Sequence, residues 1–329
     1  MEFTQRKDIS VVIPLLNEEE SLPELCRWIK EVMLKHDFRY EILLIDDGSR
    51  DRSWEVIMEI AKENPNVEGI RFNRNYGKSA ALHTGFEEAK GEVVITMDAD
   101  LQDSPDEIPE LYRLIKKEGY DLISGWKKER HDPISKTIPS LFFNFVTRKI
   151  SGIKLHDFNC GLKSYDVQVV KNLELYGEMH RYIPMLAKRH GFDRIGEKVV
   201  EHRARKYGNS KFGLERFIFG FLDLLSISFV SKFKKRPMHF FGTMGTLSFF
   251  FGIIVALGLI IDKVYKLQYQ LYAREVTDQP LFFLALVAVI VGVQLFMAGF
   301  VAEMITMNTG KKNDYIISEK ISYPRNKVF

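Results

Sequence analysis

The sequence predicts an α/β domain with a mainly parallel sheet, followed by an interfacial amphipathic helix and a two-helix transmembrane hairpin. The first observation behind this prediction is that short apolar runs alternate with segments of helical periodicity. The second is that the apolar runs end in polar residues, and the third is that two long apolar stretches follow near the C-terminus. Strands that alternate with helices are typical of a parallel sheet, which binds ligands at the carboxyl ends of its strands.

The helical segments are identified by the spacing of their apolar residues and by their start signals. Apolar residues from Leu22 to Val32 recur at the spacing of one helix face. Ser104-Pro105 precedes a later helical segment, and proline is favoured in the first turn of a helix. The expected strands are residues 9–14, 41–45, 69–72, 93–97 and 121–124, and the expected helices are residues 18–35, 52–63, 78–89 and 106–117.

Polar residues follow each of the first four expected strands. Asn17-Glu18 follows the first, Asp46-Asp47-Gly48-Ser49 the second, Asn73 to Lys78 the third, and Asp98 with Asp100 the fourth. The second group taken alone is also explained as a turn and a helix cap. Because parallel strands end at the same edge of a sheet, we expect all four groups to lie close together.

The fourth of these strands ends in a pattern that suits a divalent cation. Its residues are apolar and mostly β-branched without alternation, which indicates a strand buried on both faces. Asp98 and Asp100 then supply two carboxylates, and Gln102 adds a neutral oxygen. Such hard oxygen ligands are those that Mg²⁺ or Mn²⁺ prefers. An Asp-x-Asp by itself is weak support, because acidic loops are common.

Composition excludes several other functions. The chain has 329 residues, 28% of them charged, and a formal net charge of +3, so we expect no nucleic-acid partner. Cys26 and Cys160 lie far apart, which suggests a reducing compartment and two small buried apolar residues. The polar N-terminus lacks the apolar core of a secretory signal, so the first domain is expected in the cytosol. The chain contains no Gly-x-Gly-x-x-Gly fingerprint for a dinucleotide.

Two apolar stretches near the C-terminus are long enough to cross a bilayer. Residues 240–261 carry no charge, and residues 280–305 carry only Glu303. A span needs about 20 apolar residues, whereas buried core helices, the alternative, rarely run so long without a charge. Basic residues flank the pair, namely Lys232, Lys234, Lys235 and Arg236 before it and Lys311 and Lys312 after it. Positive-inside bias therefore predicts a hairpin with both ends in the cytosol.

The segment before the hairpin has the pattern of an amphipathic helix. In residues 212–234, polar and apolar side chains fall on opposite sides of a helical wheel, which suits the membrane interface or packing on the domain. The expected organisation is a cytosolic domain at 1–211, juxtamembrane helices at 212–236, two spans within 237–306 and a cytosolic tail at 307–329.

Seven motifs together resemble a known family. They are residues 11–18, 45–49, 77–81, 97–102, 157–163, 180–184 and 205–211. As a set they resemble the inverting glycosyltransferases of the GT-A fold, and more narrowly the polyisoprenyl-phosphate group that includes dolichol-phosphate mannose synthase and bactoprenol glucosyltransferase. The resemblance covers roughly residues 8–212, and the two-span tail matches only in architecture.

The resemblance implies roles for individual residues. Nucleotide-sugar binding would fall to Pro14, Leu16, Asn17, Glu18, Asp47 and Lys78. Asp98 would contact ribose or metal, and Asp100 and Gln102 would coordinate Mg²⁺ or Mn²⁺. The diphosphate would be covered by Arg205, Ser210 and Lys211, and the acceptor phosphate would meet Lys127, Arg130 and Lys136. Many relatives carry Tyr at the position of Leu16 and Arg at that of Lys127, which weakens base stacking and bidentate phosphate binding here.

The resemblance also implies the reaction. One sugar would pass with inversion from a UDP- or GDP-linked donor to undecaprenyl or dolichyl phosphate at the cytoplasmic membrane, within cell-envelope glycan synthesis. Asp98, Asp100 and Arg205 would be the catalytic residues. A phosphate monoester is largely ionised near neutral pH, with a second pKa of about 6, so the acceptor needs no strong general base. His83, His156, His180 and His202 are therefore expected to be structural or to position substrate.

Two other functions remain open from the sequence. A processive polysaccharide synthase shares the nucleotide-binding half, but usually has more spans and a Gln-x-x-Arg-Trp segment. A non-catalytic nucleotide-sugar sensor or membrane scaffold would not need Asp100 or Arg205. Gly242, Gly245 and Gly252 would permit close helix approach, so a homo-oligomer is also open. The motifs do not distinguish among donor sugars.

Overall fold

The computed structural model describes residues 7–128, 144–149, 151–203, 206–207, 237–308 and 317–321. The chain divides into two compact units. One unit combines residues 1–225 with residues 313–329, and the other is residues 226–312. The C-terminal end of the chain therefore belongs to the same unit as its N-terminal part.

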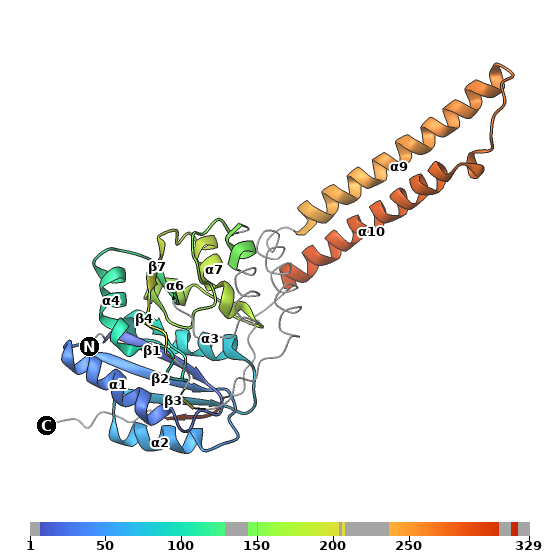
Figure 1. The fold of residues 1–329 in the computed structure, drawn as a ribbon. Coiled ribbons are helices and arrows are strands. Elements are labelled where there is room, and N and C mark those ends of the chain that lie inside the picture. Colours follow the sequence, from blue (N-terminus) through green and yellow to red (C-terminus); the bar gives the residue numbers. More distant parts are fainter. Residues whose placement is uncertain are drawn as a thin grey trace, which may run out of the picture. The chain divides into compact units, whose positions relative to one another are not determined.

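The first unit is built on one sheet of eight strands in the order β7-β5-β6-β4-β1-β2-β3-β8 (Figure 1). Strand β6 runs antiparallel to both of its neighbours, β8 runs antiparallel to β3, and the other pairs are parallel. The predicted mainly parallel sheet is confirmed. The strands are β1 Lys7–Leu15, β2 Tyr40–Asp46, β3 Val67–Phe72, β4 Gly91–Thr96, β5 Leu122–Trp126, β6 Lys163–Asp166, β7 Ile195–Val199 and β8 Ile317–Ile321.

Helices connect most of these strands. They are α1 Leu22–Lys35, α2 Ser53–Glu63, α3 Lys78–Glu88, α4 Ile108–Lys116, α6 Val167–Lys171 and α7 Ile183–Arg189, with the 3₁₀ turns η1 Pro105–Glu107 and η2 Met179–Tyr182. The expected elements agree with these bounds within a few residues. The largest difference is at α1, which begins at Leu22 rather than at residue 18. There the Glu18 backbone N–H bonds to the Ser53 hydroxyl, which holds residues 18–21 in the preceding loop.

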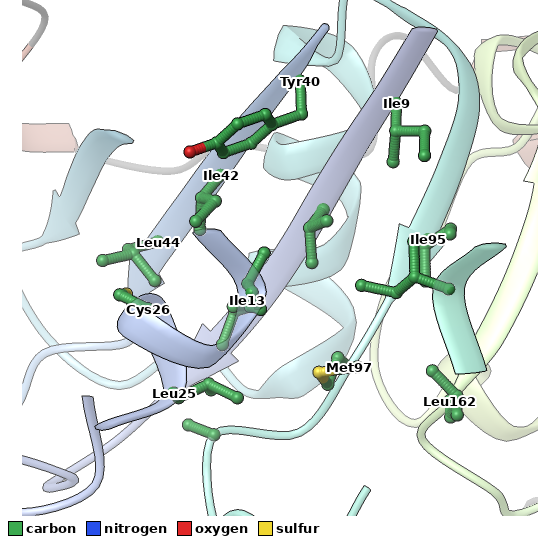
Figure 2. Close-up of a cluster of buried hydrophobic side chains, with 14 of the residues drawn as sticks. Ile9, Ile13, Leu25, Cys26, Tyr40, Ile42, Leu44, Ile95, Met97 and Leu162 are labelled. Carbon is green, nitrogen blue, oxygen red and sulfur yellow. The ribbon is translucent and has the colours of Figure 1, made fainter. Parts of the chain in front are cut away.

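Strand β1 is buried on both faces, which explains its uninterrupted apolar run. Ile13 belongs to the main core with Leu25 of α1 and Met97 after β4, as Figure 2 shows. On the other face Val12 packs against Gly85 of α3, where an added Cβ would lie 2.2 Å from Val12 Cγ1. Full burial of such a side chain contributes roughly 1.5–3 kcal/mol. The sheet is thereby fixed between helices, and only its strand ends are left for a site.

The eighth strand was not predicted from the sequence. Residues 317–321 fall in the segment that we expected to be a separate tail, but they pair with β3 along its free edge. The pairing is antiparallel and joins Gly69 to Ile321 and Phe72 to Ile317, with a register shift between Arg71 and Phe72. The chain thus returns to its first sheet after the apolar helices.

The second unit is a helical hairpin of α9 Pro237–Gln268 and α10 Pro280–Asn308, with the turn η3 Val276–Asp278 between them. Both helices are long and apolar enough to cross a membrane, and only 11% of each apolar window is buried within the protein. This agrees with the predicted spans and indicates a membrane-associated protein. The juxtamembrane segment at 212–236 lies outside the described residues.

Helices α9 and α10 run side by side (Figure 1), and small residues let their backbones approach closely. A Cβ at Gly245 would lie 2.6 Å from the Gly292 carbonyl oxygen, and a Cβ at Gly252 would lie 2.6 Å from that of Ala285. The Ser248 hydroxyl donates to the Ala288 carbonyl at 2.8 Å. Gly245 and Gly252 therefore serve packing within one hairpin, and the Gly242 backbone nitrogen would lie 3.3 Å from a Cβ added at Gly299 of α10.

Candidate active site

The predicted polar loops do converge at one edge of the sheet. In the parallel register Leu15 of β1 pairs with Asp46 of β2, and Val12 pairs with Thr96 of β4. These three strands therefore end at nearly the same level, and the loops that follow them meet. Hydrogen bonds between the loops fix them to one another.

The loops after β1 and β2 are joined through Asn17. Its backbone N–H donates to the Ser49 hydroxyl at 2.9 Å, and its side-chain oxygen accepts from the Arg50 N–H at 2.8 Å. Asn17 has φ 56°, in the left-handed region that asparagine tolerates better than most residues. Pro14 lies in β1 and Leu16 is half-buried directly beyond its end, so the predicted base-binding residues border this joint.

Asp47 fastens the loop after β2 to the loop before α3. Its two carboxylate oxygens accept from the backbone N–H groups of Tyr76 at 2.7 Å and Gly77 at 2.9 Å. Burial raises the pKa of Asp47 to about 6, although these two backbone donors act in the opposite direction. The neighbouring Gly48 has φ 76°, and a Cβ there would lie 2.5 Å from the Arg74 carbonyl carbon. Only glycine fits this crossing of two loops.

Asp98 is held between a lysine and a glycine. Lys78, the first residue of α3, places its Nζ 2.5 Å from Asp98 Oδ1. Burial would raise the pKa of Asp98, but the Lys78 ammonium outweighs it and lowers the pKa to about 2. On the other side, a Cβ at Gly161 would lie 2.4 Å from Asp98 Oδ2. The carboxylate is thus ionised and confined to one position.

Asp100 and Gln102 lie on a sharply bent loop. The Gln102 backbone N–H donates to Asp100 Oδ1 at 3.2 Å, and the Gln102 amide nitrogen donates to the Arg203 carbonyl at 3.3 Å. Leu101 between them is buried and has φ 61°. A non-glycine residue in the left-handed region costs roughly 1–3 kcal/mol and is typical of functional sites. Burial of the Leu101 side chain offsets this strain.

The oxygen atoms of this loop fit a divalent cation that also binds substrate. Within the described residues no three His, Cys, Asp or Glu side chains gather around one point. Asp98 and Asp100 with the Gln102 amide would give two carboxylates and one neutral oxygen. Mg²⁺ usually takes one or two carboxylates and completes its shell with substrate phosphates and water. The donor set therefore suits a metal brought in with a nucleoside diphosphate.

A small cavity with a cationic lining opens beside Asp98. Its empty volume, including the mouth, is ≈ 260 Å³. Its polar lining includes Lys78, Thr96, Asn159, Lys163, Tyr165, His180 and Arg181. Lys163 is only 4% exposed and donates to the Cys160 carbonyl rather than to a carboxylate, and burial lowers its pKa. Such a lining suits an anionic group of a substrate.

Lys127 is paired inside the protein. Its Nζ lies 2.9 Å from Asp103 Oδ1, and the side chains are 15% and 0% exposed. Burial would lower the pKa of Lys127, but Asp103 raises it above the ordinary range for lysine. The charge predicted to meet an acceptor phosphate is therefore already neutralised by a buried partner.

The remaining predicted residues divide into two groups. Arg130, Lys136, Arg205, Ser210 and Lys211 lie outside the described residues. The histidines have local partners where these are described. His180 Nδ1 lies 3.1 Å from the Ser79 hydroxyl, and His156 contacts Glu197 and stacks on Trp126. These contacts agree with a structural or positioning role.

Three site residues were not singled out from the sequence, namely Gly161, Lys163 and Arg181. Each lies in a motif that carried the family resemblance, at residues 157–163 or 180–184. Gly161 and Lys163 lie near Asp98 because β6 pairs antiparallel with β4, with Lys163 opposite Thr96, whereas Arg181 reaches the same cavity from η2. The alternation of strands and helices in the first part of the chain does not predict an antiparallel strand of this kind.

Comparison with known proteins places the chain in a family. The family model described as glycosyl transferase family 2 matches residues 10–173. The dodecaprenyl-phosphate galacturonate synthase of Rhizobium johnstonii is 35% identical over 304 residues, covering 92% of this chain and 88% of that protein. The undecaprenyl-phosphate 4-deoxy-4-formamido-L-arabinose transferase of Pseudomonas fluorescens is 36% identical over 260 residues, covering 78% and 73%.

Solved structures agree on the fold. Glucosyl-3-phosphoglycerate synthase from Mycobacterium tuberculosis in complex with UDP matches with a TM-score of 0.53 at 20% identity, covering 68% of this chain and 80% of that one. The same enzyme crystallised with Mn²⁺, UDP-glucose and phosphoglyceric acid gives a TM-score of 0.53 at 19% identity. The predicted GT-A fold and the predicted resemblance to polyprenyl-phosphate glycosyltransferases are confirmed. The chain therefore belongs to glycosyl transferase family 2 and is a glycosyltransferase.

Proposed function

We propose that this protein transfers one sugar, with inversion, from a nucleotide sugar to a membrane-embedded polyprenyl phosphate. The observation that carries the proposal is the convergence of Asp98 and Asp100 with the loops after β1 and β2, in a chain that continues into two apolar helices. The two relatives named above are polyprenyl-phosphate sugar transferases by name, and they match across most of their length.

The donor nucleotide would lie over the joined loops. Pro14, Leu16, Asn17 and Glu18 border the end of β1 and would contact base and ribose. Asp47 already accepts two backbone hydrogen bonds, so its main contribution is to hold the loops in register. Leu16 offers an apolar contact to the base in place of an aromatic stack.

The diphosphate would lie between a cation and basic side chains. Asp98, Asp100 and Gln102 would hold Mg²⁺ or Mn²⁺, which neutralises charge that develops on the leaving nucleoside diphosphate. Lys78 keeps Asp98 ionised and in place. Arg205, Ser210 and Lys211 would close over the phosphates from the segment before the hairpin. No general base is required, because the acceptor phosphate is already an anion.

The acceptor phosphate would be bound by Arg130 and Lys136. Lys127 lies on the same segment after β5, but its ion pair with Asp103 suits it to hold that segment rather than to bind the lipid. The cavity lined by Lys163 and Arg181, the latter 3.3 Å from Glu178, is a second surface near Asp98 that would accept an anionic group. Both surfaces would draw the acceptor headgroup toward the donor sugar.

The hairpin would anchor the enzyme where its acceptor lies. We propose that the catalytic domain and both chain ends face the cytosol. The pairing of β8 with β3 supports this arrangement, because residues on either side of the hairpin belong to one sheet. Flanking lysines and arginines support it independently through positive-inside bias.

The transfer of a single sugar is favoured over polymer synthesis. Within the described residues two helices qualify as spans, and an export channel usually needs more. A non-catalytic scaffold is disfavoured by the intact oxygen set of Asp98, Asp100 and Gln102.

The proposal is tested by transfer in vitro. The purified full-length protein in detergent is mixed with Mn²⁺, undecaprenyl phosphate and one radiolabelled nucleotide sugar at a time, from a panel of UDP- and GDP-linked sugars. We expect one donor to yield a lipid that carries a single sugar, identified by mass spectrometry. A polymer would indicate a processive synthase. Absence of labelled lipid with every donor would contradict the proposal.

A further inference from the structure

Strand β8 contacts α2, which follows the loop from Asp46 to Ser49. We call this loop the donor loop, because the donor nucleotide would lie over it. Glu319 Oε2 accepts a hydrogen bond from Trp54 Nε1 at 2.8 Å. Trp54 is 1% exposed and lies in the first turn of α2, directly after the loop that begins at Asp46. Without Glu319 this buried indole N–H would lose its described acceptor. A strand from the far end of the chain thus completes the surroundings of a core residue beside the site.

Arg71 links Glu319 and Trp54 to the donor loop. In the sheet Arg71 pairs with Glu319, and its guanidinium carbon lies 5.8 Å from the centroid of the Trp54 ring. From there Arg71 Nη2 donates to the Ser49 carbonyl at 3.4 Å, and Arg71 Nε lies 3.6 Å from Asp46 Oδ2. Asp46 in turn accepts from the Ser49 backbone N–H at 2.8 Å. Contacts therefore run without a gap from Glu319 to the loop after β2.

A second contact on β8 has a different target. Lys320 Nζ lies 2.6 Å from Glu88 Oε2, and Glu88 is the last residue of α3. These side chains are 40% and 30% exposed, and Glu88 lies at the end of α3 opposite to Lys78. This ion pair attaches β8 to the domain without touching the donor loop, so it provides a matched control on the same strand.

We infer that residues 317–321 form a positioning strand for the nucleotide site, in which Glu319 acts through Trp54 and Arg71 to hold the loop from Asp46 to Ser49. The inference rests on the proposed function, because it assumes that this loop binds the donor nucleotide. Glu319 does not touch substrate. Its effect is on the position of the loop over which the donor nucleotide would lie, so Glu319 should alter donor affinity and leave acceptor affinity unchanged.

The experiment compares Glu319→Ala, Glu319→Gln and Lys320→Ala in the full-length protein. UDP and GDP, each with Mn²⁺, are titrated into every variant by calorimetry, and the KM values for donor and acceptor are measured separately. We expect Glu319→Ala to weaken binding of the preferred nucleotide and to raise the donor KM roughly three- to tenfold, the scale of one lost hydrogen bond. Acceptor KM should be unchanged. Glu319→Gln keeps an acceptor for Trp54 and should restore donor binding, and Lys320→Ala should bind as the wild type does.

Several outcomes overturn the inference. Equal losses in Glu319→Ala and Lys320→Ala would make β8 a general support for the domain. A lower melting temperature with unchanged nucleotide affinity in Glu319→Ala would do the same. If the wild type binds neither UDP nor GDP, the proposed donor site fails and the inference fails with it. If the wild type binds one of them and Glu319→Ala binds it equally well, only the inference fails.

Discussion

Asp98 illustrates how single residues define the site. Lys78 attracts its carboxylate from one side, and Gly161 leaves just enough space for it on the other. Three residues further on, Leu101 bends the chain so that the Gln102 backbone N–H donates to the Asp100 carboxylate. Charge, space and backbone strain each fix one part of the oxygen set, and the first two can be tested separately.

The role of the Asp100 negative charge in metal binding is tested by Asp100→Asn. The substitution removes one negative charge from a half-buried loop and keeps its size, so the fold should persist while metal binding weakens. We expect sugar transfer to be lost, with an unchanged circular dichroism spectrum. EDTA should abolish the transfer catalysed by the wild type, and Mn²⁺ should restore it. Full activity in the variant, or activity that EDTA does not reduce, would contradict the metal assignment.

The space that Gly161 leaves for the Asp98 carboxylate is tested by Gly161→Ala. A Cβ at this position would overlap Asp98 Oδ2 at 2.4 Å, so the carboxylate must leave the position in which Lys78 and Gly161 hold it. We expect transfer to fall at least about tenfold, since misplacement near 1 Å is enough for losses of that size or more. Gly177→Ala is the control for strain without a clash, because Gly177 has φ 54° and nothing lies within 4 Å of an added Cβ. Similar losses in both variants would indicate general destabilisation.

Burial of a charge is tested through Asp47 and pH. Its pKa is raised from 3.8 to about 6 in the folded protein, so between these values the folded state binds more protons than the unfolded state. Stability from this group therefore falls as pH rises from about 4 to about 6 and is constant above. The change is on the order of 2–3 kcal/mol, at about 1.4 kcal/mol per pKa unit. Melting temperatures measured across this range should show the slope in the wild type and lack it in Asp47→Asn, apart from a constant offset. Parallel curves would exclude Asp47 as the source.

At the scale of elements, the hairpin depends on contact between two backbones. Gly245→Leu would drive a side chain into α10, since even a Cβ would lie 2.6 Å from the Gly292 carbonyl oxygen. Overpacking of this kind typically costs about 1–3 kcal/mol, so the melting temperature in detergent should fall. Gly258→Leu is the control on the same helix, because an added Cβ at Gly258 meets nothing within 4 Å. If both variants melt alike, the close approach at Gly245 does not stabilise the hairpin.

The elements differ in how far the sequence predicts them. Apolar runs predict β1, β2 and β4 well, because burial on both faces requires uninterrupted apolar residues. The loops at their ends could also be predicted, since parallel strands end together. Glu41 shows a feature that the local sequence pattern does not predict. It is fully buried within β2, where it pairs with Lys7 and accepts from Ser10, and nothing in its local pattern signals that environment.

Long-range pairing is the other limit of sequence-based prediction. Strand β8 has only five residues, three of them polar, and its partner β3 lies far away in the chain. The family resemblance predicts a contact between Lys127 and the acceptor phosphate, but it does not predict the ion pair that the fold forms between Lys127 and Asp103. Both features depend on which segments meet in space, and spacing along the chain does not encode that.

For the whole molecule, topology is the decisive prediction. Tags at both chain ends should be cytosolic, and the turn between α9 and α10 should lie on the opposite face of the membrane. Gln270→Cys places a thiol at an exposed position in that turn. We expect an impermeant maleimide to label it in intact cells, while native Cys26 and Cys160 are buried and should not react. Labelling only after lysis would overturn the hairpin topology.

The return of the chain to its first sheet sets the order in which the enzyme is completed during synthesis. The ribosome releases the N-terminal part first, at about 5–20 residues per second. Strands β1 to β7 therefore exist before α9 and α10 have been made, and β3 remains an open edge throughout membrane insertion. The edge is covered by β8, whose residues emerge after both of these helices. A chain cut short by a nonsense mutation or by a protease would keep β3 exposed, and an uncovered strand recruits other chains into aggregates.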